Sequence, residues 1–269
     1  MTDLEIVANT IRRHILTMSA AAKAPHVGSA LSCVEILVTL YFRVARIDPS
    51  KPRDPSRDRI ILSKGHACAA LYACLAERGF FPKERLEEYA RDNSVMAEHP
   101  SVGALPGIEA TTGSLGHGLG IGLGMALAAK MDALSARVFV VLSDGELNEG
   151  SVWEAALWAP AHNLDNVTAI VDFNGLQATG PSREITAIEP LADKWRSFGW
   201  QALEVDGHDM AQLAAAFEAH HPGKPLAIVA RTVKGRGVSF MENNLEWHYR
   251  PPSPDDLAKA LAELDGSRR

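Results

Sequence analysis

Residues 138–174, VFVVLSDGELNEGSVWEAALWAPAHNLDNVTAIVDFN, decide the fold class of this chain. The stretch contains two apolar runs, at 138–142 and 167–173, and a predicted helix at about 148–162 joins them. Neither run alternates apolar with polar residues, and this pattern is typical of strands that are buried on both faces. Because a helical crossover between two such strands implies that they run parallel, the sequence predicts a parallel sheet.

Short apolar runs and helical stretches continue to alternate on both sides of this unit. Further strands are expected at 59–63, 200–205 and 226–230. Helices are expected near 4–22, 31–43, 67–78, 115–134, 189–198, 209–220 and 254–264, and loops with one short helix over 79–113. The predicted fold class is therefore α/β, a doubly wound parallel sheet with helices on both faces. Because we find no linker, residues 1–269 are expected to form a single domain.

Composition and charge exclude several classes of protein. Of the 269 residues 46% are apolar and 22% are charged, which favours a sizeable core over disorder. The net charge is −6 and no Lys/Arg run occurs, so we expect neither nucleic-acid nor membrane binding. The N-terminus does not resemble a signal peptide, and no apolar stretch is long enough to span a membrane. Cys33, Cys68 and Cys74 form no disulfide framework, so we expect buried free thiols and a cytoplasmic location.

Polar residues follow the two strands of the opening stretch. Asp144 comes directly after the first strand, and Asn174 follows the second, 30 residues further on. In parallel sheets ligands bind at the carboxyl ends of the strands, so both side chains can reach the same edge. Carboxylate, amide and carbonyl oxygens are ligands suited to Mg²⁺ or Ca²⁺. The alternative for Asp144 alone is a helix cap, but the second strand end favours a metal–phosphate site.

These strand ends resemble a known motif. Asp-Gly followed about 30 residues later by Asn is similar to the thiamin diphosphate motif, and LSDGELNEGSVWEA at 142–155 resembles its transketolase version, with Ser143 where that family has Gly. Other segments are similar to transketolases along nearly the whole chain: APHVGS at 24–29, SKGHA at 63–67, EHPSVGALPGIEATTGSLGHG at 98–118, DGHD at 206–209 and KGRG at 234–237.

The resemblance implies a role for specific residues. Asp144, Asn174 and the Leu176 carbonyl would hold Mg²⁺, with Ca²⁺ as the other suitable ion. His26 and His99 would be catalytic and face the donor sugar. The implied cofactor-binding residues are His66, Gly113, Ser114, Leu115, Asp144, Gly145, Glu146, Asn174 and His248. The isolated histidines His14, His117, His162, His220 and His221 are expected to be structural.

The resemblance also implies an activity and a partner. The chain looks like the N-terminal, diphosphate-binding subunit of a split transketolase, a glycolaldehyde transferase that moves a two-carbon ketol unit from a ketose to an aldose. Thiamin diphosphate would serve as the electron sink. The pyrimidine-type and C-terminal domains, with the Glu that activates the cofactor, are absent here and expected on a partner chain, in an α₂β₂ assembly. The helix at 115–134 and the helix bearing Glu149 and Glu154 are the expected contact regions.

Three other functions remain as alternatives. One is the alpha subunit of a 2-oxo-acid dehydrogenase, which also binds thiamin diphosphate. Another is a catalytically silent binding module of the same fold. The third is a nicotinamide dehydrogenase, but the glycines at 116–124 do not follow the G-x-G-x-x-G spacing and come before a helix without a preceding strand. The transketolase resemblance is favoured because Asp144 and Asn174 are both intact.

Overall fold

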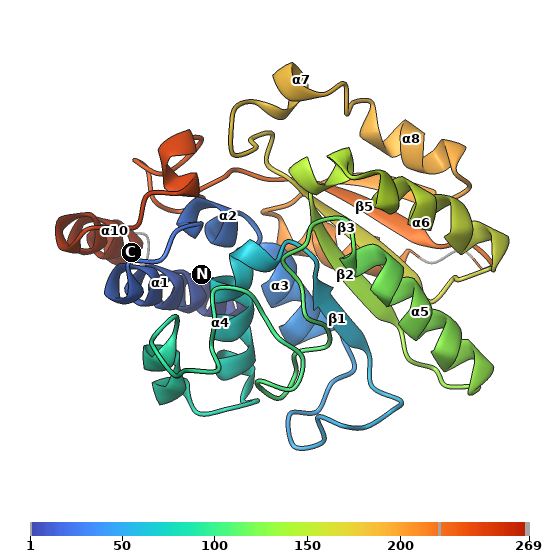
Figure 1. Cartoon of the computed structure of the whole chain (residues 1–269), viewed down its shortest axis with the longest axis horizontal. Helices are drawn as coiled ribbons and strands as arrows, with labels where there is room; N and C mark the ends of the chain where they lie inside the picture. The colour runs from blue at the N-terminus through green and yellow to red at the C-terminus, as the bar shows by residue number, and fades with distance from the viewer. Residues whose placement is uncertain (1, 220–221, 267–269) are drawn as a thin grey trace.

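A five-stranded parallel sheet forms the centre of the computed structural model, which describes residues 2–219 and 222–266 (Figure 1). The strands are β1 (Arg59–Leu62), β2 (Val138–Ser143), β3 (Val167–Phe173), β4 (Gln201–Asp206) and β5 (Leu226–Arg231). Their order is β1-β2-β3-β5-β4, and every neighbouring pair is parallel. The predicted parallel α/β sheet is confirmed, and each expected strand lies within about one residue of its observed bounds.

Helices cover both faces of the sheet. The first face carries α1 (Asp3–Ala22), α2 (Val27–Ser32), α3 (Val34–Thr39), α4 (Cys68–Arg78), α9 (Met210–Glu218) and α10 (Pro254–Gly266). The second carries α5 (Gly118–Met131), α6 (Gly150–Ala161) and α8 (Leu191–Ser197). Alternate residues of each strand enter one of two apolar clusters: Phe139 of β2 joins the first and Val140 the second. The strands are therefore buried on both faces, which explains their unbroken apolar runs.

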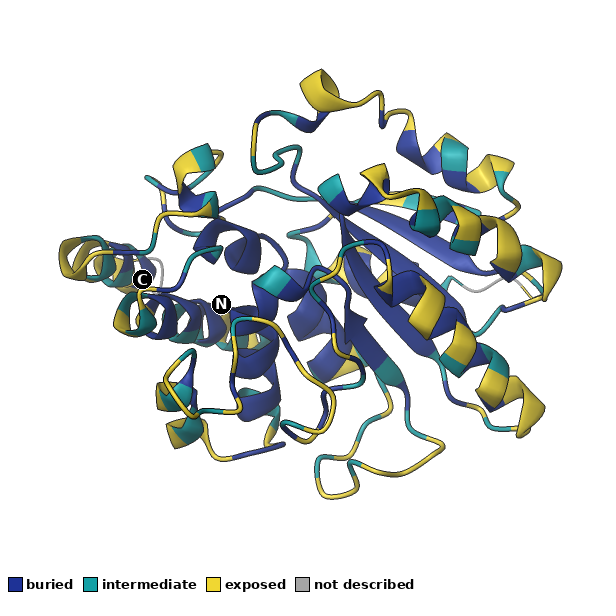
Figure 2. Cartoon of the chain, in the orientation of Figure 1, coloured by how far each residue is buried: buried dark blue, intermediate teal, exposed yellow. Residues whose placement is uncertain are grey.

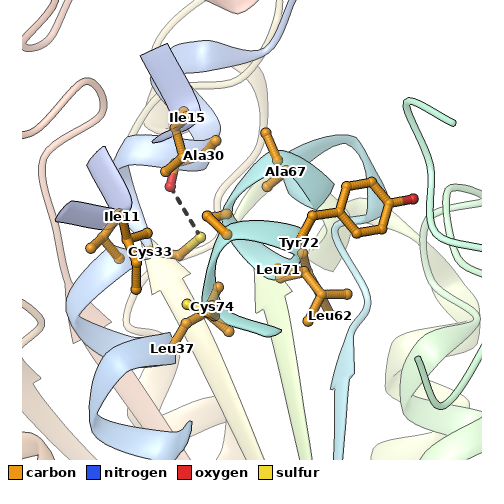
Figure 3. Packing of buried hydrophobic residues seen from close by; sticks show 14 of the residues in the cluster. Ile11, Ile15, Ala30, Cys33, Leu37, Leu62, Ala67, Leu71, Tyr72 and Cys74 are labelled. Carbon is orange, nitrogen blue, oxygen red and sulfur yellow. Dashed lines mark hydrogen bonds between the residues drawn. The ribbon is translucent and has the colours of Figure 1, made fainter. Parts of the chain in front are cut away.

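Four helices pack closely around two of the cysteines. Cys33 and Cys74 lie among side chains of α1, α2, α3 and α4, and the Cys33 thiol is 3.5 Å from the Ala30 carbonyl oxygen (Figure 3). All three cysteines are free and buried, as predicted. The capping box of Thr2 and Glu5 that starts α1 is also present. Within the described ranges no helix is long and apolar enough to cross a membrane.

Two predicted helices differ from the structure. The stretch 31–43 is not one helix, because α2 ends at Ser32, α3 follows, and a π-helical turn, η1, takes over at Leu40–Val44. The Ser32 hydroxyl donates to Asp172 below the sheet edge (2.6 Å). The helix expected from 115 begins only at Gly118 and ends at Met131, because Gly116 has a φ of 86° and Ala133 a φ of 53°, both outside the helical region.

Short helical segments complete the chain, mostly near the carboxyl edge of the sheet. They are η2 (Gly65–Ala67), η3 (Lys83–Glu88), η4 (Gly145–Asn148), α7 (Ser182–Ile185) and η5 (Leu245–His248). Strand register brings their neighbours together, since the last residue of β2, Ser143, pairs with Asp172 of β3. Asp144 and Asn174 thus leave the sheet side by side, as the sequence predicts.

Candidate functional site

A cavity of about 290 Å³ opens at the carboxyl edge of the sheet. Segments from five parts of the chain form its wall: the start of α2, η2, the loop before α5, the ends of β2 and β3, and η5. The predicted site residues on this wall are His26, His66, His99, Gly113, Leu115, Asp144, Gly145, Asn174, Leu176 and His248. Residues that were expected on chemical or motif grounds therefore meet at one place.

Asp144 forms the buried end of the cavity. The residue is only 1% exposed, and its Oδ2 accepts hydrogen bonds from the Gly175 N–H (2.9 Å) and the Ser182 hydroxyl (2.7 Å). Burial raises the pKa of the Asp144 carboxyl. In residues 2–219 and 222–266 no Lys or Arg forms an ion pair with this carboxylate. A buried carboxylate without an ion-pair partner favours a cation beside it.

The other two predicted metal ligands stand next to Asp144. The Asn174 side-chain oxygen accepts from the Leu176 N–H (3.1 Å), and the Leu176 carbonyl accepts from the Lys234 ammonium (3.3 Å). No group of three or more His, Cys, Asp or Glu side chains suited to a metal occurs in the described residues. The residues present fit a hard divalent cation, because one carboxylate, one amide and one carbonyl oxygen leave positions for phosphate oxygens and water.

Three further histidines surround His26. The centroid of the His26 ring lies 5.2 Å from that of His66, 6.5 Å from that of His99 and 5.1 Å from that of His248. The backbone N–H of His26 donates to the His248 carbonyl (2.8 Å), which ties the start of α2 to η5. Both residues predicted to face the sugar and both predicted to bind diphosphate are thus brought together.

Burial keeps the inner histidines neutral. It lowers the pKa of His26 to about 4 and that of His248 to about 3, with the charge of Lys234 adding to both shifts. Burial also holds the pKa of His66 well below its usual range, reinforced by the charge of Lys64. Near pH 7 each ring therefore carries one N–H donor and one acceptor nitrogen, as hydrogen bonding to phosphate or hydroxyl groups requires.

Lys234 is a site residue that the sequence reasoning did not single out. It is 1% exposed, and its ammonium reaches both the His248 Nδ1 (2.8 Å) and the Leu176 carbonyl. Burial lowers its pKa to about 8. The available signal was the KGRG segment at 234–237, where a lysine precedes a glycine just after a buried strand. Lys234 is the cation of this wall and suits an anionic ligand such as diphosphate.

A second lysine supports the cavity from below. Lys64 and Asp172 form an ion pair in which both side chains are fully buried. The Lys64 ammonium also donates to the Ser29 carbonyl (2.9 Å), while the Ser29 hydroxyl bonds to the His66 Nε2 (2.9 Å). Asp172 accepts in addition from Thr232 (2.5 Å). The network therefore holds α2, η2 and the end of β3 in fixed positions below the cavity.

Two predicted cofactor-binding residues do not line the cavity. Glu146 is fully buried and accepts hydrogen bonds from the Ser63 hydroxyl, the Gly116 N–H (2.9 Å) and the Ser143 N–H (3.2 Å). Ser114 is exposed, and its hydroxyl lies 3.4 Å from the His117 Nδ1. Glu146 therefore positions the loop 113–117, and motif matching could not show that its side chain points away from the cavity.

The histidines predicted to be structural lie elsewhere in the described chain. His14 bonds to Glu77 (2.8 Å), and the ring of His162 packs 3.8 Å from that of Trp158. His117 bonds within its own loop, to the Leu115 carbonyl (3.1 Å). His220 and His221 are outside the described residues.

Comparison with known proteins agrees with this site. Residues 4–265 match the family "Transketolase, thiamine diphosphate binding domain". One of the two chains of an apulose-4-phosphate transketolase from Phocaeicola vulgatus, named as a subunit, is 39% identical over 97% of this chain and 93% of its own length. The 6-deoxy-6-sulfo-D-fructose transketolase subunit SqwG of a Clostridium species is 42% identical over 98% of this chain and 96% of its own.

Full-length transketolases match over part of their length. Human transketolase is 39% identical over 97% of this chain but only 41% of its own length. A crystal structure of a transketolase mutant from Pichia stipitis superposes with a TM-score of 0.93 at 30% identity, covering 98% of this chain and 41% of that one. The chain thus spans about two-fifths of these proteins. Fold, site and comparisons agree that this chain belongs to the transketolase family, as a thiamine diphosphate binding domain.

Proposed function

We propose that the chain is the diphosphate-binding subunit of a transketolase that works only with a second chain. The observation that carries this proposal is the single cavity in which Asp144, Asn174, Lys234 and the histidine cluster meet. The two relatives that match along their whole length are named as subunits, and both are named for ketoses with an anionic substituent, a phosphate and a sulfonate. The proposed substrate is therefore a ketose phosphate or sulfonate, which gives a two-carbon ketol unit to an aldose.

The cavity residues divide between the cofactor and the sugar. In this proposal Asp144, Asn174 and the Leu176 carbonyl hold Mg²⁺, and His66, Lys234 and His248 bind the diphosphate. Asp144 supplies the charge for the metal, and neutral imidazoles supply N–H donors to phosphate oxygens.

His26 and His99 face the sugar. When bound, thiamin diphosphate supplies the carbon nucleophile and the electron sink for breaking the bond between C2 and C3 of the ketose. His26 and His99 then orient the ketose and hold or release protons at its oxygens. The two-carbon unit passes to C1 of the acceptor, so that the donor leaves as an aldose two carbons shorter.

A second chain is needed because the rest of the site is not built here. His99 is exposed, and the cavity wall beside it is open. The outer faces of α5 and α6 are exposed as well (Figure 2) and carry apolar side chains, with Met131 77% and Leu157 59% exposed. Gly120 and Gly124 on α5 have open space around them, so another backbone can approach closely. We propose that these faces contact the partner, in an α₂β₂ assembly.

The decisive experiment compares the isolated chain with the reconstituted pair. Each is given thiamin diphosphate, Mg²⁺, a ketose donor such as fructose 6-phosphate or 6-deoxy-6-sulfo-D-fructose, and glyceraldehyde 3-phosphate as acceptor. We expect ketol transfer by the pair alone, and a size that corresponds to two copies of each chain. Robust turnover by the isolated chain would contradict the split-enzyme proposal.

The same preparation separates the alternatives. The family match favours a transketolase over the alpha subunit of a 2-oxo-acid dehydrogenase. A silent binding module predicts no Mg²⁺-dependent uptake of thiamin diphosphate by the pair, whereas the present proposal predicts saturable uptake. A cytoplasmic location is part of the proposal because three free thiols suit a reducing compartment.

A further inference from the structure

Tyr249 is a cavity residue to which the proposed reaction gives no role. It comes directly after His248, at the end of η5, and it lines the same cavity as His26 and Asn174. The residue is 63% exposed, although its neighbour Trp247 is 2% exposed. A large aromatic ring that is held at the mouth of a ligand cavity and left open to solvent is available for ligand contact.

The Tyr249 ring belongs to the cluster around His26. Its centroid lies 5.7 Å from that of His26 and 4.7 Å from that of His248. The distance to His26 is shorter than the 6.5 Å that separates His26 from His99. Whatever reaches the His26 ring from solvent therefore passes close to the Tyr249 ring. In this chain the sugar side of the cavity has an exposed aromatic rim as well as an exposed histidine.

The base of Tyr249 is fixed while its ring is free. Trp247 is buried in the core, and its indole N–H donates to the Phe240 carbonyl (3.1 Å). The His248 ring is held by Lys234, and the Tyr249 backbone N–H donates to the Glu246 carbonyl (3.3 Å). Anchoring on both residues lowers the entropy that is lost when the ring binds a ligand.

The chemistry of the side chain suits a sugar. In the part of the chain that the structure describes, the Tyr249 hydroxyl has no hydrogen-bond partner, so it can donate to or accept from a ligand hydroxyl. The ring offers an apolar face to C–H groups. An open carbon chain with alternating C–H and O–H groups, such as that of a ketose, presents both kinds of contact.

We propose that Tyr249 is a substrate-positioning residue that binds the hydroxyl-bearing carbon chain of the ketose donor beside His26. The inference rests on the proposed function and adds to it a residue that determines donor affinity. Because the contact involves carbons that do not react, it is made equally in the ground state and the transition state. Its loss therefore raises KM and leaves kcat nearly unchanged.

The test uses the reconstituted pair loaded with thiamin diphosphate and Mg²⁺, with fructose 6-phosphate as donor. We expect Tyr249→Ala to raise the donor KM about tenfold, to change kcat by less than about twofold, and to weaken fructose 6-phosphate binding in calorimetry by the same factor. Tyr249→Phe keeps the ring and measures the hydroxyl alone. Cofactor affinity and partner affinity are expected to stay unchanged in both variants.

Arg250→Ala is the matched control. Its side chain belongs to the same loop but points elsewhere, since it stacks over Trp247 and pairs with Asp256 (3.0 Å). We expect the control to leave donor KM and calorimetric affinity at their wild-type values. An equal rise in KM in this variant would mean that loop disturbance explains the effect, and it would overturn the inference.

Two other outcomes also overturn it. An unchanged donor KM in Tyr249→Ala means that the ring does not touch the sugar. A loss of partner affinity, with donor KM unchanged in the assembled pair, means that the ring belongs to the interface between chains. In both cases the wild-type pair still transfers ketol units, so the proposed function survives. A wild-type pair that neither binds nor converts any ketose refutes the proposed function itself.

Discussion

Replacing Glu35 with Gln should remove a defined part of the acid sensitivity of the fold. Glu35, on α3, accepts from the Arg12 guanidinium (2.5 Å) and bonds to the His208 Nδ1 (2.9 Å). His208 in turn accepts from the Val233 N–H (2.8 Å), and Arg12 donates to the Arg236 carbonyl (3.0 Å). The network thus holds the loop that carries Lys234 at both ends.

The size of the effect follows from the pKa of Glu35. Burial alone would raise this pKa, but the Arg12 charge and the His208 hydrogen bond together lower it from 4.5 to about 2. A difference of about 2.5 units between the unfolded and folded states corresponds to about 3 kcal/mol of stability at neutral pH. Because the folded pKa is the lower one, this contribution is fully present above about pH 4.5 and is lost as the pH falls towards 2.

Urea unfolding of the wild type and of Glu35→Gln across this range measures the contribution. Between pH 7 and pH 3 the wild type should lose about 2 kcal/mol more stability than the variant. The difference should persist at high salt, because buried ion pairs are screened little. Glu88→Gln is the control, since the Glu88–Arg85 pair (2.9 Å) is exposed and its contribution should vanish in salt. Parallel stability curves for the wild type and Glu35→Gln would refute the reasoning.

Three further predictions concern the cofactor. Asp144→Asn keeps the shape of the ligand but removes its charge, so Mg²⁺-dependent binding of thiamin diphosphate by the pair should weaken at least tenfold in calorimetry; unchanged affinity would contradict the metal site. His66→Ala and His248→Ala each remove a hydrogen-bond donor, so the cofactor requirement should rise about tenfold while the melting temperature stays near that of the wild type. A variant that fails to fold would show a structural histidine instead. Lys234→Met removes the buried cation, and the salt dependence of cofactor binding should fall with it.

The strands were predictable because the fold buries both of their faces. Burial on two sides demands apolar side chains at every position, and such runs are visible in the sequence, as at 138–142 for β2. Helices whose ends depend on tertiary contacts were harder. The predicted helix 31–43 missed the break after Ser32, where the side chain bonds to an aspartate 140 residues away. No local pattern encodes a contact of that range.

The site residues fall into the same two classes. Asp144 and Asn174 could be found by chemistry alone, because they follow neighbouring buried strands and the register of β2 on β3 fixes their proximity. His26, His66 and His248 come from loops whose approach depends on the whole fold, so only the resemblance to a family identified them. Lys234 was missed because a lysine in a glycine-rich loop is usually solvated, and only the structure shows it 1% exposed.

The distribution of burial across the cavity explains why the cofactor could be inferred more closely than the sugar. Groups assigned to metal and diphosphate are buried and fully hydrogen bonded within this chain, from Asp144 at one end to Lys234 and His248 at the other. Groups assigned to the sugar stand at an exposed rim, formed here by His99 and Tyr249. A buried group constrains its ligand through the desolvation that it demands, whereas an exposed rim leaves the choice to whatever closes over it. The identity of the ketose is therefore expected to depend on residues of both chains, with Tyr249 as the contribution of this one.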